Sequence, residues 1–192
     1  MRMINIENSC CFTGYRPDKF DFPLEESNPQ YRQFFTRLAT GIADMINNGC
    51  TDFYCGMAQG FDIMAGEHVA IIKKLNKRIR LIGVVPYEGQ EKGWGAEWQH
   101  RYRALLAECD EVVTLNTQYT KWVFQQRNEY MVDRSRYCLT YFDGKRGGTD
   151  NTVKYAVKHS RVVLNIYDTD PNEELISQFK CNAHLLPPED SE

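Results

Sequence analysis

The chain has 192 residues, of which 42% are hydrophobic, and its formal net charge is -3. This length and apolar content suffice for one domain with a hydrophobic core. The charge excludes a general basic field for nucleic acid or anionic membranes, and no apolar run approaches the ~20 residues of a membrane-spanning helix. The N-terminus lacks a secretory apolar stretch, so we expect a cytoplasmic protein.

The cysteine and histidine patterns argue against a disulfide framework and against a metal site. The seven cysteines include no C-x-x-C pair, and several lie in apolar runs, where a reduced thiol behaves as a small hydrophobic group. The four histidines are scattered and do not have the spacing of metal ligands. We therefore predict structural thiols, no metal and no cofactor.

The first quarter of the chain predicts a strand, a loop and a helix. A short apolar strand is expected at 9–12, and Pro17 turns the chain away from it. Residues 18–29 are polar and aromatic by turns, which indicates a loop with room for a short turn of helix. An amphipathic stripe at 31–48, closed by Gly49, predicts a helix with a glycine at its C-terminal end.

The next strand ends at Cys55 and leads into a turn bracketed by two glycines. Gly56 and Gly60 allow backbone angles that a side chain resists, and they let a ligand approach the main chain. Asp62 is placed to cap a helix at 63–75. The unpaired amides and the dipole of a helix start suit a phosphate group. An ordinary tight connection without a ligand is the alternative for this turn.

Strands and helices continue to alternate through the rest of the domain. Strands are expected at 80–85, 111–115, 137–142 and 161–167, and helices at 95–108, 122–136 and 149–160. The strands are continuous apolar runs, as expected where both faces of a sheet are covered. This order predicts an α/β fold with one doubly wound, mostly parallel sheet and helices on both faces. The domain is expected to span 1–167, and an acidic C-terminal tail follows at 168–192.

In such a sheet, ligands bind beyond the carboxyl ends of the strands. The residues that follow the predicted strands are polar, glycine-rich and aromatic, with few fixed cations. They suit one anionic group surrounded by hydroxyls and by a ring that can stack. The predicted ligand-binding residues are Thr13, Gly14, Tyr15, Arg16, Gly56, Gln59, Gly60, Asp62, Pro86, Tyr87, Gln90, Gly147, Gly148 and Thr149.

The segment 147–149 repeats the chemistry of the 56–62 turn. Two glycines bring the main chain close, and Thr149 is expected to cap the last helix and to offer its hydroxyl to a phosphate. An ordinary capped loop is the alternative. Arg16 is the best candidate for a cation on a phosphate or a carboxylate, because its planar fork is always charged. The sequence contains neither a Walker motif nor a G-x-G-x-x-G fingerprint.

Evidence for catalysis is weaker than evidence for binding. Glu88 and Glu91 are candidate acid–base residues, although a glutamate in a polar loop is usually just solvated. No Ser-His-Asp or Cys-His arrangement is evident, and no nucleophile stands out. Whether the protein is an enzyme therefore stays open.

Several segments share an order of motifs with a known family. They are Cys11-Phe12-Thr13-Gly14-Tyr15-Arg16-Pro17, Gly56-Met57-Ala58-Gln59-Gly60-Phe61-Asp62, Val85-Pro86-Tyr87-Glu88-Gly89-Gln90-Glu91 with Trp94, Arg127-Asn128, Met131-Val132-Asp133, and Asp143-Gly144 through Gly147-Gly148-Thr149 to Thr152 and Tyr155-Ala156. Over about residues 9 to 167 this combination resembles the YpsA-like family of the SLOG superfamily. The resemblance implies a Rossmann-like fold.

The resemblance also implies a nucleotide or nucleotide-derived ligand, such as an ADP-ribose derivative, at the loops named above. The superfamily includes the DNA-processing protein DprA and the LOG nucleoside-monophosphate phosphoribohydrolases. The LOG motif Pro-Gly-Gly-x-Gly-Thr-x-x-Glu ends in a catalytic glutamate. Thr152 occupies that position here, which weakens the transfer of this activity.

Three functions remain open. We favour a sensor that binds a nucleotide-derived small molecule. The alternatives are an N-glycosidase or phosphoribohydrolase, and a DprA-like binder of single-stranded DNA, although the net charge argues against a nucleic-acid partner. Superfamily relatives often form dimers, which makes a homodimer an option. We also expect Gly60→Val to abolish ligand binding while the fold stays intact.

Overall fold

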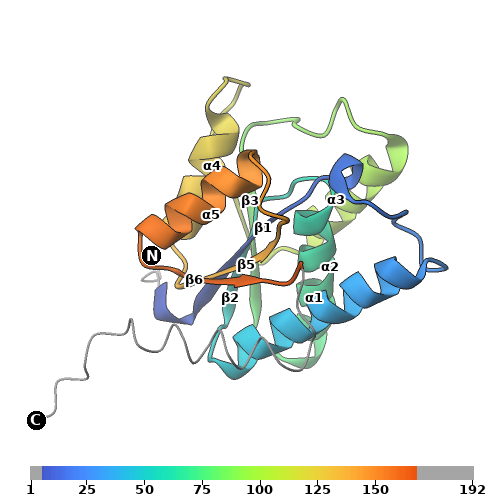
Figure 1. Ribbon diagram of the computed structural model, residues 1–192. Helices are drawn as coiled ribbons and strands as arrows, with labels where there is room; N and C mark the ends of the chain where they lie inside the picture. The colour runs from blue at the N-terminus through green and yellow to red at the C-terminus, as the bar shows by residue number, and fades with distance from the viewer. Residues whose placement is uncertain (1–5, 168–192) are drawn as a thin grey trace, which may run out of the picture.

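The computed structural model describes residues 6–167, so the predicted acidic tail at 168–192 lies outside the described residues. Strands and helices alternate along the chain (Figure 1). In order the elements are η1 (Ile6–Asn8), β1 (Ser9–Gly14), η2 (Pro17–Lys19), α1 (Pro29–Asn47), β2 (Asp52–Cys55), α2 (Phe61–Leu75), β3 (Arg80–Val85), α3 (Ala96–Glu108), β4 (Glu111–Thr114), α4 (Val123–Asp133), β5 (Tyr137–Tyr141), α5 (Gly148–Lys158) and β6 (Val162–Asn165).

The described strands form one sheet with the order β4-β3-β2-β1-β5-β6, and every pair of neighbours is parallel. This confirms the predicted doubly wound α/β sheet. The chain adds strands outward from β1 to β4 and then returns to place β5 on the other side of β1. The order therefore reverses between β1 and β5, which is where such sheets bind ligands.

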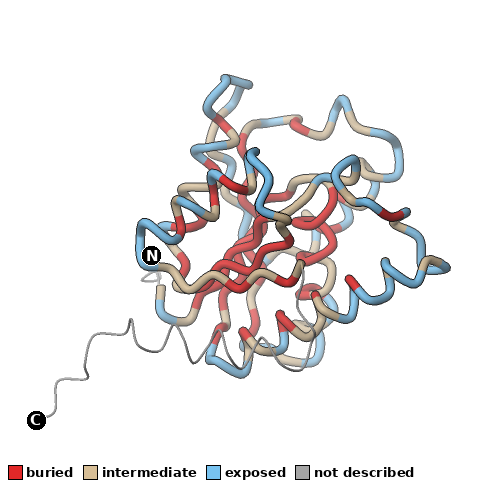
Figure 2. The backbone as a smooth tube through the Cα atoms, viewed as in Figure 1, coloured by how far each residue is buried: buried red, intermediate tan, exposed pale blue. Residues whose placement is uncertain are grey.

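Helices cover both faces of the sheet, and a hydrophobic core lies under each layer (Figures 1 and 2). α1, α2 and α3 pack on one face, where Phe12, Phe53 and Phe61 are fully buried. α4 and α5 pack on the other face over a smaller cluster that includes Met131 and Cys138. The two layers hold the strand ends in fixed positions, so the loops at those ends rest on a rigid base.

The cysteines within residues 6–167 are free thiols, and five of these six are buried. Burial raises the pKa of the Cys10 and Cys55 thiols well above the usual range. These thiols pack as small hydrophobic groups, in agreement with the prediction of structural thiols.

α1 begins two residues before the predicted start at residue 31. The Asn28 side-chain oxygen accepts the N–H groups of Gln30 at 2.8 Å and of Tyr31 at 3.2 Å, and Pro29 is the first helical residue. An Asn-Pro start is a strong helix signal. The apolar stripe begins only at Tyr31, so the hydrophobic pattern alone predicts a helix start that is two residues too late.

β4 is an edge strand with little cover. Glu111, Val112 and Thr114 are exposed, so the expectation that both faces of every strand are covered is wrong here. Arg80 donates a hydrogen bond to Glu111 at 3.1 Å. A charged side chain at a sheet edge disfavours pairing with a strand of another molecule.

Candidate ligand-binding edge

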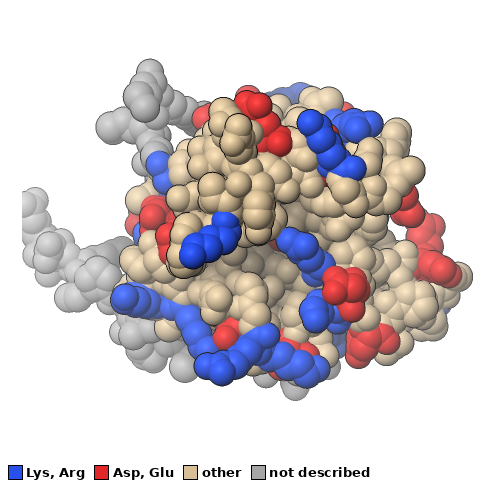
Figure 3. All heavy atoms as spheres, turned by 90° about the horizontal axis from the view of Figure 1, so that it is seen from above, with Lys and Arg blue, Asp and Glu red and all other residues tan. Residues whose placement is uncertain are grey.

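The loops that follow β1, β2, β3 and β5 meet at one edge of the sheet, because parallel strands end on the same side. The predicted ligand-binding residues therefore share one face. Seen from this face, Lys and Arg side chains border a hollow near its middle (Figure 3). The loop after β1 contacts the loops on both of its sides.

Tyr15 joins the loop after β1 to the loop after β5. Its hydroxyl donates to Oδ1 of Asp143 and accepts the Asp143 N–H at 3.0 Å. The pKa of Tyr15 is raised to about 12. Burial is the largest cause, and the hydrogen bond to Asp143 is the second. Lys145 and Tyr15 lower the pKa of Asp143 to about 2. Thr149 adds a second link, because its hydroxyl donates to the Gly14 carbonyl at 3.1 Å.

The turn after β2 packs tightly against the loop after β1. Gly60 has a φ of +87°, and a Cβ at this position would lie 2.3 Å from the Tyr15 carbonyl oxygen. The same carbonyl accepts the Phe61 N–H at 2.9 Å, so the first amide of α2 is already bonded. The expectation that Gly60→Val leaves the fold intact is wrong, because any side chain here collides with the main chain of Tyr15.

Asp62 and Arg127 form a buried pair beneath this turn. Asp62 is the second residue of α2, so the prediction that it caps this helix is wrong. Gly60 occupies the cap position instead. The two residues are 5% and 6% exposed, and Oδ2 of Asp62 lies 3.7 Å from Nη1 of Arg127. Burial raises the pKa of Asp62 to about 6 against the attraction of Arg127, and burial also lowers the pKa of Arg127.

A chain of hydrogen bonds leads from Arg127 to the start of α5. Arg127 donates through Nη1 to the Gly56 carbonyl at 2.5 Å and through Nε to Oδ1 of Asn128 at 2.8 Å. Asn128 Nδ2 donates to Oγ1 of Thr152 at 2.7 Å, and that hydroxyl donates to the Gly148 carbonyl at 2.9 Å. We call Asp62, Arg127, Asn128 and Thr152 the polar network. It connects the two glycine loops that the sequence singles out.

The start of α5 is open, in contrast to the start of α2. α5 begins at Gly148 with Gly147 as its cap residue, and no described side chain caps it. Thr149 is the second helical residue, so its predicted capping role is wrong; its hydroxyl instead bonds to the loop after β1. A Cβ built at Gly147 or Gly148 meets no atom within 4 Å. An uncovered helix start of this kind suits an anion.

Arg16 is an exposed cation that lies over an aromatic ring. Its guanidinium carbon is 5.4 Å from the centre of the Phe124 ring. Within residues 6–167 its side chain has no hydrogen bond or ion pair. Phe124 also contacts Tyr87 and Tyr119, with ring centroids 6.1 and 6.2 Å away. These residues place a free cation beside rings that can stack on a ligand.

Gln90 faces inward and supports the turn after β2. It is buried, and its Nε2 donates to the Met57 carbonyl at 3.1 Å. Met57 has a φ of +55°, which is uncommon for a residue with a side chain, so this bond stabilises a strained position. Glu88 is exposed, and Glu91 lies 4.0 Å from Arg103. Neither glutamate is hydrogen bonded to the polar network within the described part of the chain.

The remaining predicted site residues form the base and the side of this edge. Thr13 is buried at the end of β1. Pro86 is buried at the end of β3, and its carbonyl accepts a hydrogen bond from Asn116 at 2.9 Å. Gln59 is half-buried in the turn after β2. All three lie at the ends of neighbouring strands, as predicted.

A cavity of about 290 Å³ opens between α4 and α5 at this edge. Residues that line it include Trp122, Phe124, Asn128, Gly148, Asn151 and Thr152. The cavity therefore combines the uncovered start of α5 with an aromatic ring and with two members of the polar network. This is a mixed surface of the kind that binds small organic molecules.

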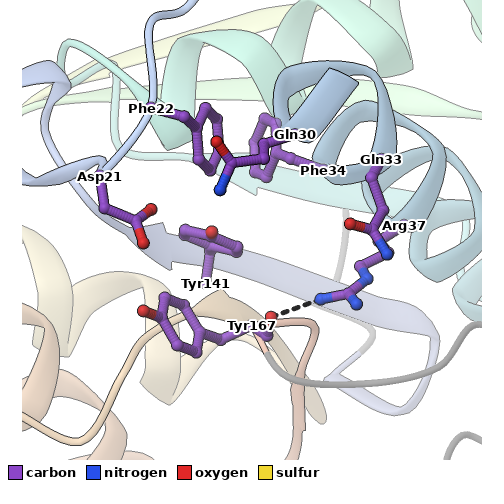
Figure 4. A pocket seen from close by; sticks show the side chains of 8 residues that line it. All are labelled: Asp21, Phe22, Gln30, Gln33, Phe34, Arg37, Tyr141 and Tyr167. Atoms are coloured by element: carbon purple, nitrogen blue, oxygen red, sulfur yellow. Dashed lines mark hydrogen bonds between the residues drawn. The ribbon is translucent and has the colours of Figure 1, made fainter. Parts of the chain in front are cut away.

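A second cavity of about 220 Å³ lies between the start of α1 and the ends of β5 and β6. Figure 4 shows Asp21 at one end of it and Arg37 at the other, with the rings of Tyr141 and Tyr167 between them. Arg37 donates to the Tyr167 carbonyl, and its buried Nε has no partner among the described residues. None of the predicted ligand-binding residues lines this cavity.

Two further findings concern residues 6–167 alone. No helix in this range is long and apolar enough to cross a membrane. No three His, Cys, Asp or Glu side chains in the range come together in a way that could hold a metal ion.

The sequence-based list of site residues omits Phe124, Arg127, Asn128 and Thr152. A signal for Arg127 was present, because an arginine on the apolar side of the predicted helix at 122–136 needs a buried partner. Its partner, Asp62, has the sequence position of a helix cap, which conceals the pairing. No local pattern indicates that Asn128 and Thr152 bond to each other.

A family model named YpsA and described as the YspA SLOG family matches residues 10–170. The chain belongs to this family. The match confirms the resemblance proposed from the motif order, and it covers every loop of the candidate edge.

Curated relatives of this YpsA SLOG chain include two bacterial proteins. The SPbeta prophage-derived protein YoqJ of Bacillus subtilis (strain 168) is 31% identical over 144 residues, which are 68% of this chain and 84% of the relative. The UPF0398 protein ABC2016 of Shouchella clausii is 26% identical over 181 residues, which are 93% of this chain and 96% of the relative. The aligned region thus makes up most of each relative.

Two solved structures of DNA processing protein A share the fold of this YpsA SLOG chain. The protein from Streptococcus pneumoniae has a TM-score of 0.52 at 16% identity over 88% of this chain, which spans 56% of that protein. The protein from Helicobacter pylori has a TM-score of 0.54 at 16% identity over 94% of this chain and 80% of that protein. The solved structure of that protein concerns its single-stranded DNA binding mode. At this identity the likeness shows the Rossmann-like α/β fold alone.

Proposed function

We propose that this YpsA SLOG protein binds a nucleotide or nucleotide-derived small molecule, such as an ADP-ribose derivative, at the carboxyl edge of its sheet. One observation supports this more than any other. The uncovered start of α5 opens into the cavity between α4 and α5, which Phe124 also lines. A phosphate site and a stacking ring beside one cavity are the two elements that a nucleotide requires.

The phosphate is proposed to lie at Gly147, Gly148 and Thr149. A Cβ built at Gly147 or Gly148 would meet no atom within 4 Å, so the main chain there is open to a bulky anion. Arg16 supplies a cation with no ion pair among the described residues. The turn after β2 plays a different part, because the first amide of α2 is bonded to Tyr15 and the turn contains the buried Asp62.

Calorimetric titration with AMP, ADP-ribose, NAD and a cyclic nucleotide tests this proposal. We expect one of them to bind, and Arg16→Gln to weaken that binding roughly 10- to 100-fold, the loss typical of one charge-assisted hydrogen bond. Arg78→Gln is the matched control, because it makes the same charge change at an exposed residue before β3. Equal affinities for the two variants, or no binding of any nucleotide, would contradict the proposal.

Analysis of the ligands after incubation with the protein separates binding from turnover. Chromatography of each ligand after incubation detects a released base or a released phosphate. If products form, Glu88→Gln and Glu91→Gln test the two candidate acids, and the phosphoribohydrolase-type alternative then applies. Unchanged ligand together with saturable binding supports a sensor.

Single-stranded DNA is the second candidate ligand. Tyr119 and Trp122 are 61% and 55% exposed, and Lys121 Nζ lies 4.9 Å from the Trp122 ring centre. Exposed rings beside cations are the usual platform for unpaired bases. An oligonucleotide that binds more tightly than every mononucleotide, and that loses affinity on Trp122→Ala, would favour this function.

A further inference from the structure

We propose that Arg127 is a positioning residue that couples the turn after β2 to the first turn of α5. Through Arg127, a ligand bound at α5 also stabilises the turn at 56–60 without any direct contact between the ligand and that turn. The ligand half of this inference rests on the proposed function. The coupling itself is a property of the ligand-free protein.

The Arg127 guanidinium is largely enclosed by its own chain, since the residue is 6% exposed. A Cβ at Gly56 would lie 2.8 Å from its Nη1 and 2.6 Å from Oδ2 of Asp62, so the glycine main chain closes over the pair. Nη1 already donates to the Gly56 carbonyl, and Nε already donates to Asn128. Arg127 therefore acts on loops of this chain, whereas Arg16 is exposed and has no hydrogen bond or ion pair among the described residues, so it is available to a ligand.

The bonds beyond Arg127 run in one direction. Each member donates to the next, from Arg127 to Asn128, from Asn128 to Thr152, and from Thr152 to the Gly148 carbonyl. Hydrogen bonds in such a series polarise and strengthen one another. The charge at one end and the carbonyl in the first turn of α5 at the other end are thus stabilised together.

The two ends of the network differ in how their surroundings hold them, and that difference makes coupling useful. The turn at 56–60 contains Met57 in a strained backbone conformation and is held by neighbouring groups. The first turn of α5 has no capping side chain and no cover at Gly148. A buried charge cannot lose one partner without cost, so a shift of Thr152 or Asn128 is transmitted to Arg127 and to Gly56.

Hydrogen–deuterium exchange of the ligand-free protein tests the coupling. Thr152→Val removes the hydroxyl between Asn128 and Gly148, and Thr152→Ser keeps it. We expect peptides that cover 56–60, which are remote in sequence from Thr152, to exchange roughly fivefold faster in the valine variant. The serine variant should match the wild type. Lys154→Met is the control, because it removes the Lys154–Asp150 ion pair from the same helix outside the network.

The proposal is overturned if Thr152→Val accelerates exchange only within α5, as we expect for Lys154→Met. A second arm adds ADP-ribose or AMP to each variant. In the wild type and in Thr152→Ser the added nucleotide should slow exchange at both 147–152 and 56–60; slowing at 147–152 alone in both proteins would contradict the ligand half of the inference. If no nucleotide binds, the proposed function fails, and the ligand-free arm still decides the coupling.

Discussion

Asp62 is a carboxyl group that α2 carries into the interior. Its pKa rises to about 6 because burial penalises the carboxylate more than Arg127, the Ala58 N–H and Arg16 favour it. In the unfolded chain the pKa of the same group is about 3.9. The native state therefore binds this proton more tightly, and the Asp62 contribution to the free energy of unfolding decreases as the pH rises from about 4 to about 6.

Asp62→Asn removes this titration. We expect the free energy of unfolding of the variant, minus that of the wild type, to become more positive by about 2–3 kcal/mol between about pH 4 and about pH 7. Urea unfolding curves across this range measure the difference. A constant difference would mean that Asp62 ionises in the native protein as it does in water.

Asp110 provides a control of the opposite sign. Partial burial opposes its ionisation, but Lys73, the Leu81 N–H and Arg80 prevail and lower its pKa. Its ionised form therefore stabilises the native state above the pKa of the unfolded chain. The free energy of unfolding of Asp110→Asn, minus that of the wild type, should become more negative as the pH rises through the acid range.

At the scale of the element, the two glycine loops are in opposite physical states. The turn at 56–60 is closed, because the main chain of Tyr15 occupies the space beside Gly60 and bonds the first amide of α2. The loop at 144–148 is open, because nothing within 4 Å surrounds a Cβ at Gly144, Gly147 or Gly148. Glycine therefore has a different cause in each loop: packing at Gly60 and access at Gly147 and Gly148.

Gly60→Ala should accordingly destabilise the protein by about 2–4 kcal/mol. The methyl group adds a collision with the Tyr15 carbonyl to the cost of a φ that side chains avoid. Urea unfolding at neutral pH measures the loss. Gly147→Ala is the comparison and should change stability by less than about 0.5 kcal/mol, because its φ of 165° is ordinary extended backbone and its surroundings are empty. Similar losses in both variants would contradict this distinction.

The order and type of the elements could be predicted from the sequence, because each buried strand is a separate apolar run between helical patterns. The starts of α2 and α5 could not. Asp62 and Thr149 each have the side-chain oxygen and the position of a helix cap, yet Asp62 faces Arg127 and Thr149 bonds to Gly14. Local patterns report what a side chain can do, and the partner that it selects depends on distant segments of the fold.

At the scale of the whole molecule, Lys and Arg side chains border the hollow of the candidate edge (Figure 3), although the net charge of the chain is -3. The sequence predicted which loops share this edge, because all parallel strands end on one side. It did not predict the strand order, since the apolar runs of a parallel sheet look alike and their pairing is decided by packing. The position of the switch between β1 and β5 therefore came from the structure alone.

The small size of the proposed ligand predicts a weak dependence of nucleotide binding on salt. Raising NaCl from about 50 to about 200 mM should reduce the affinity by less than about tenfold, because a mononucleotide offers only a few phosphate contacts. Titrations at several salt concentrations measure the slope. A loss of about a thousandfold would indicate many phosphate contacts and would favour single-stranded DNA.

The strand order also constrains how the chain acquires its fold during synthesis. β1 is central, yet one of its two neighbours, β5, begins only at Tyr137. A nascent chain that has emerged as far as β4 can assemble four strands, but the opposite flank of β1, with Phe12 and its neighbours, still lacks its partner strand. Unpaired central strands invite aggregation. We therefore expect translation of the stretch between β4 and β5 to be the interval in which the growing polypeptide depends most on chaperones.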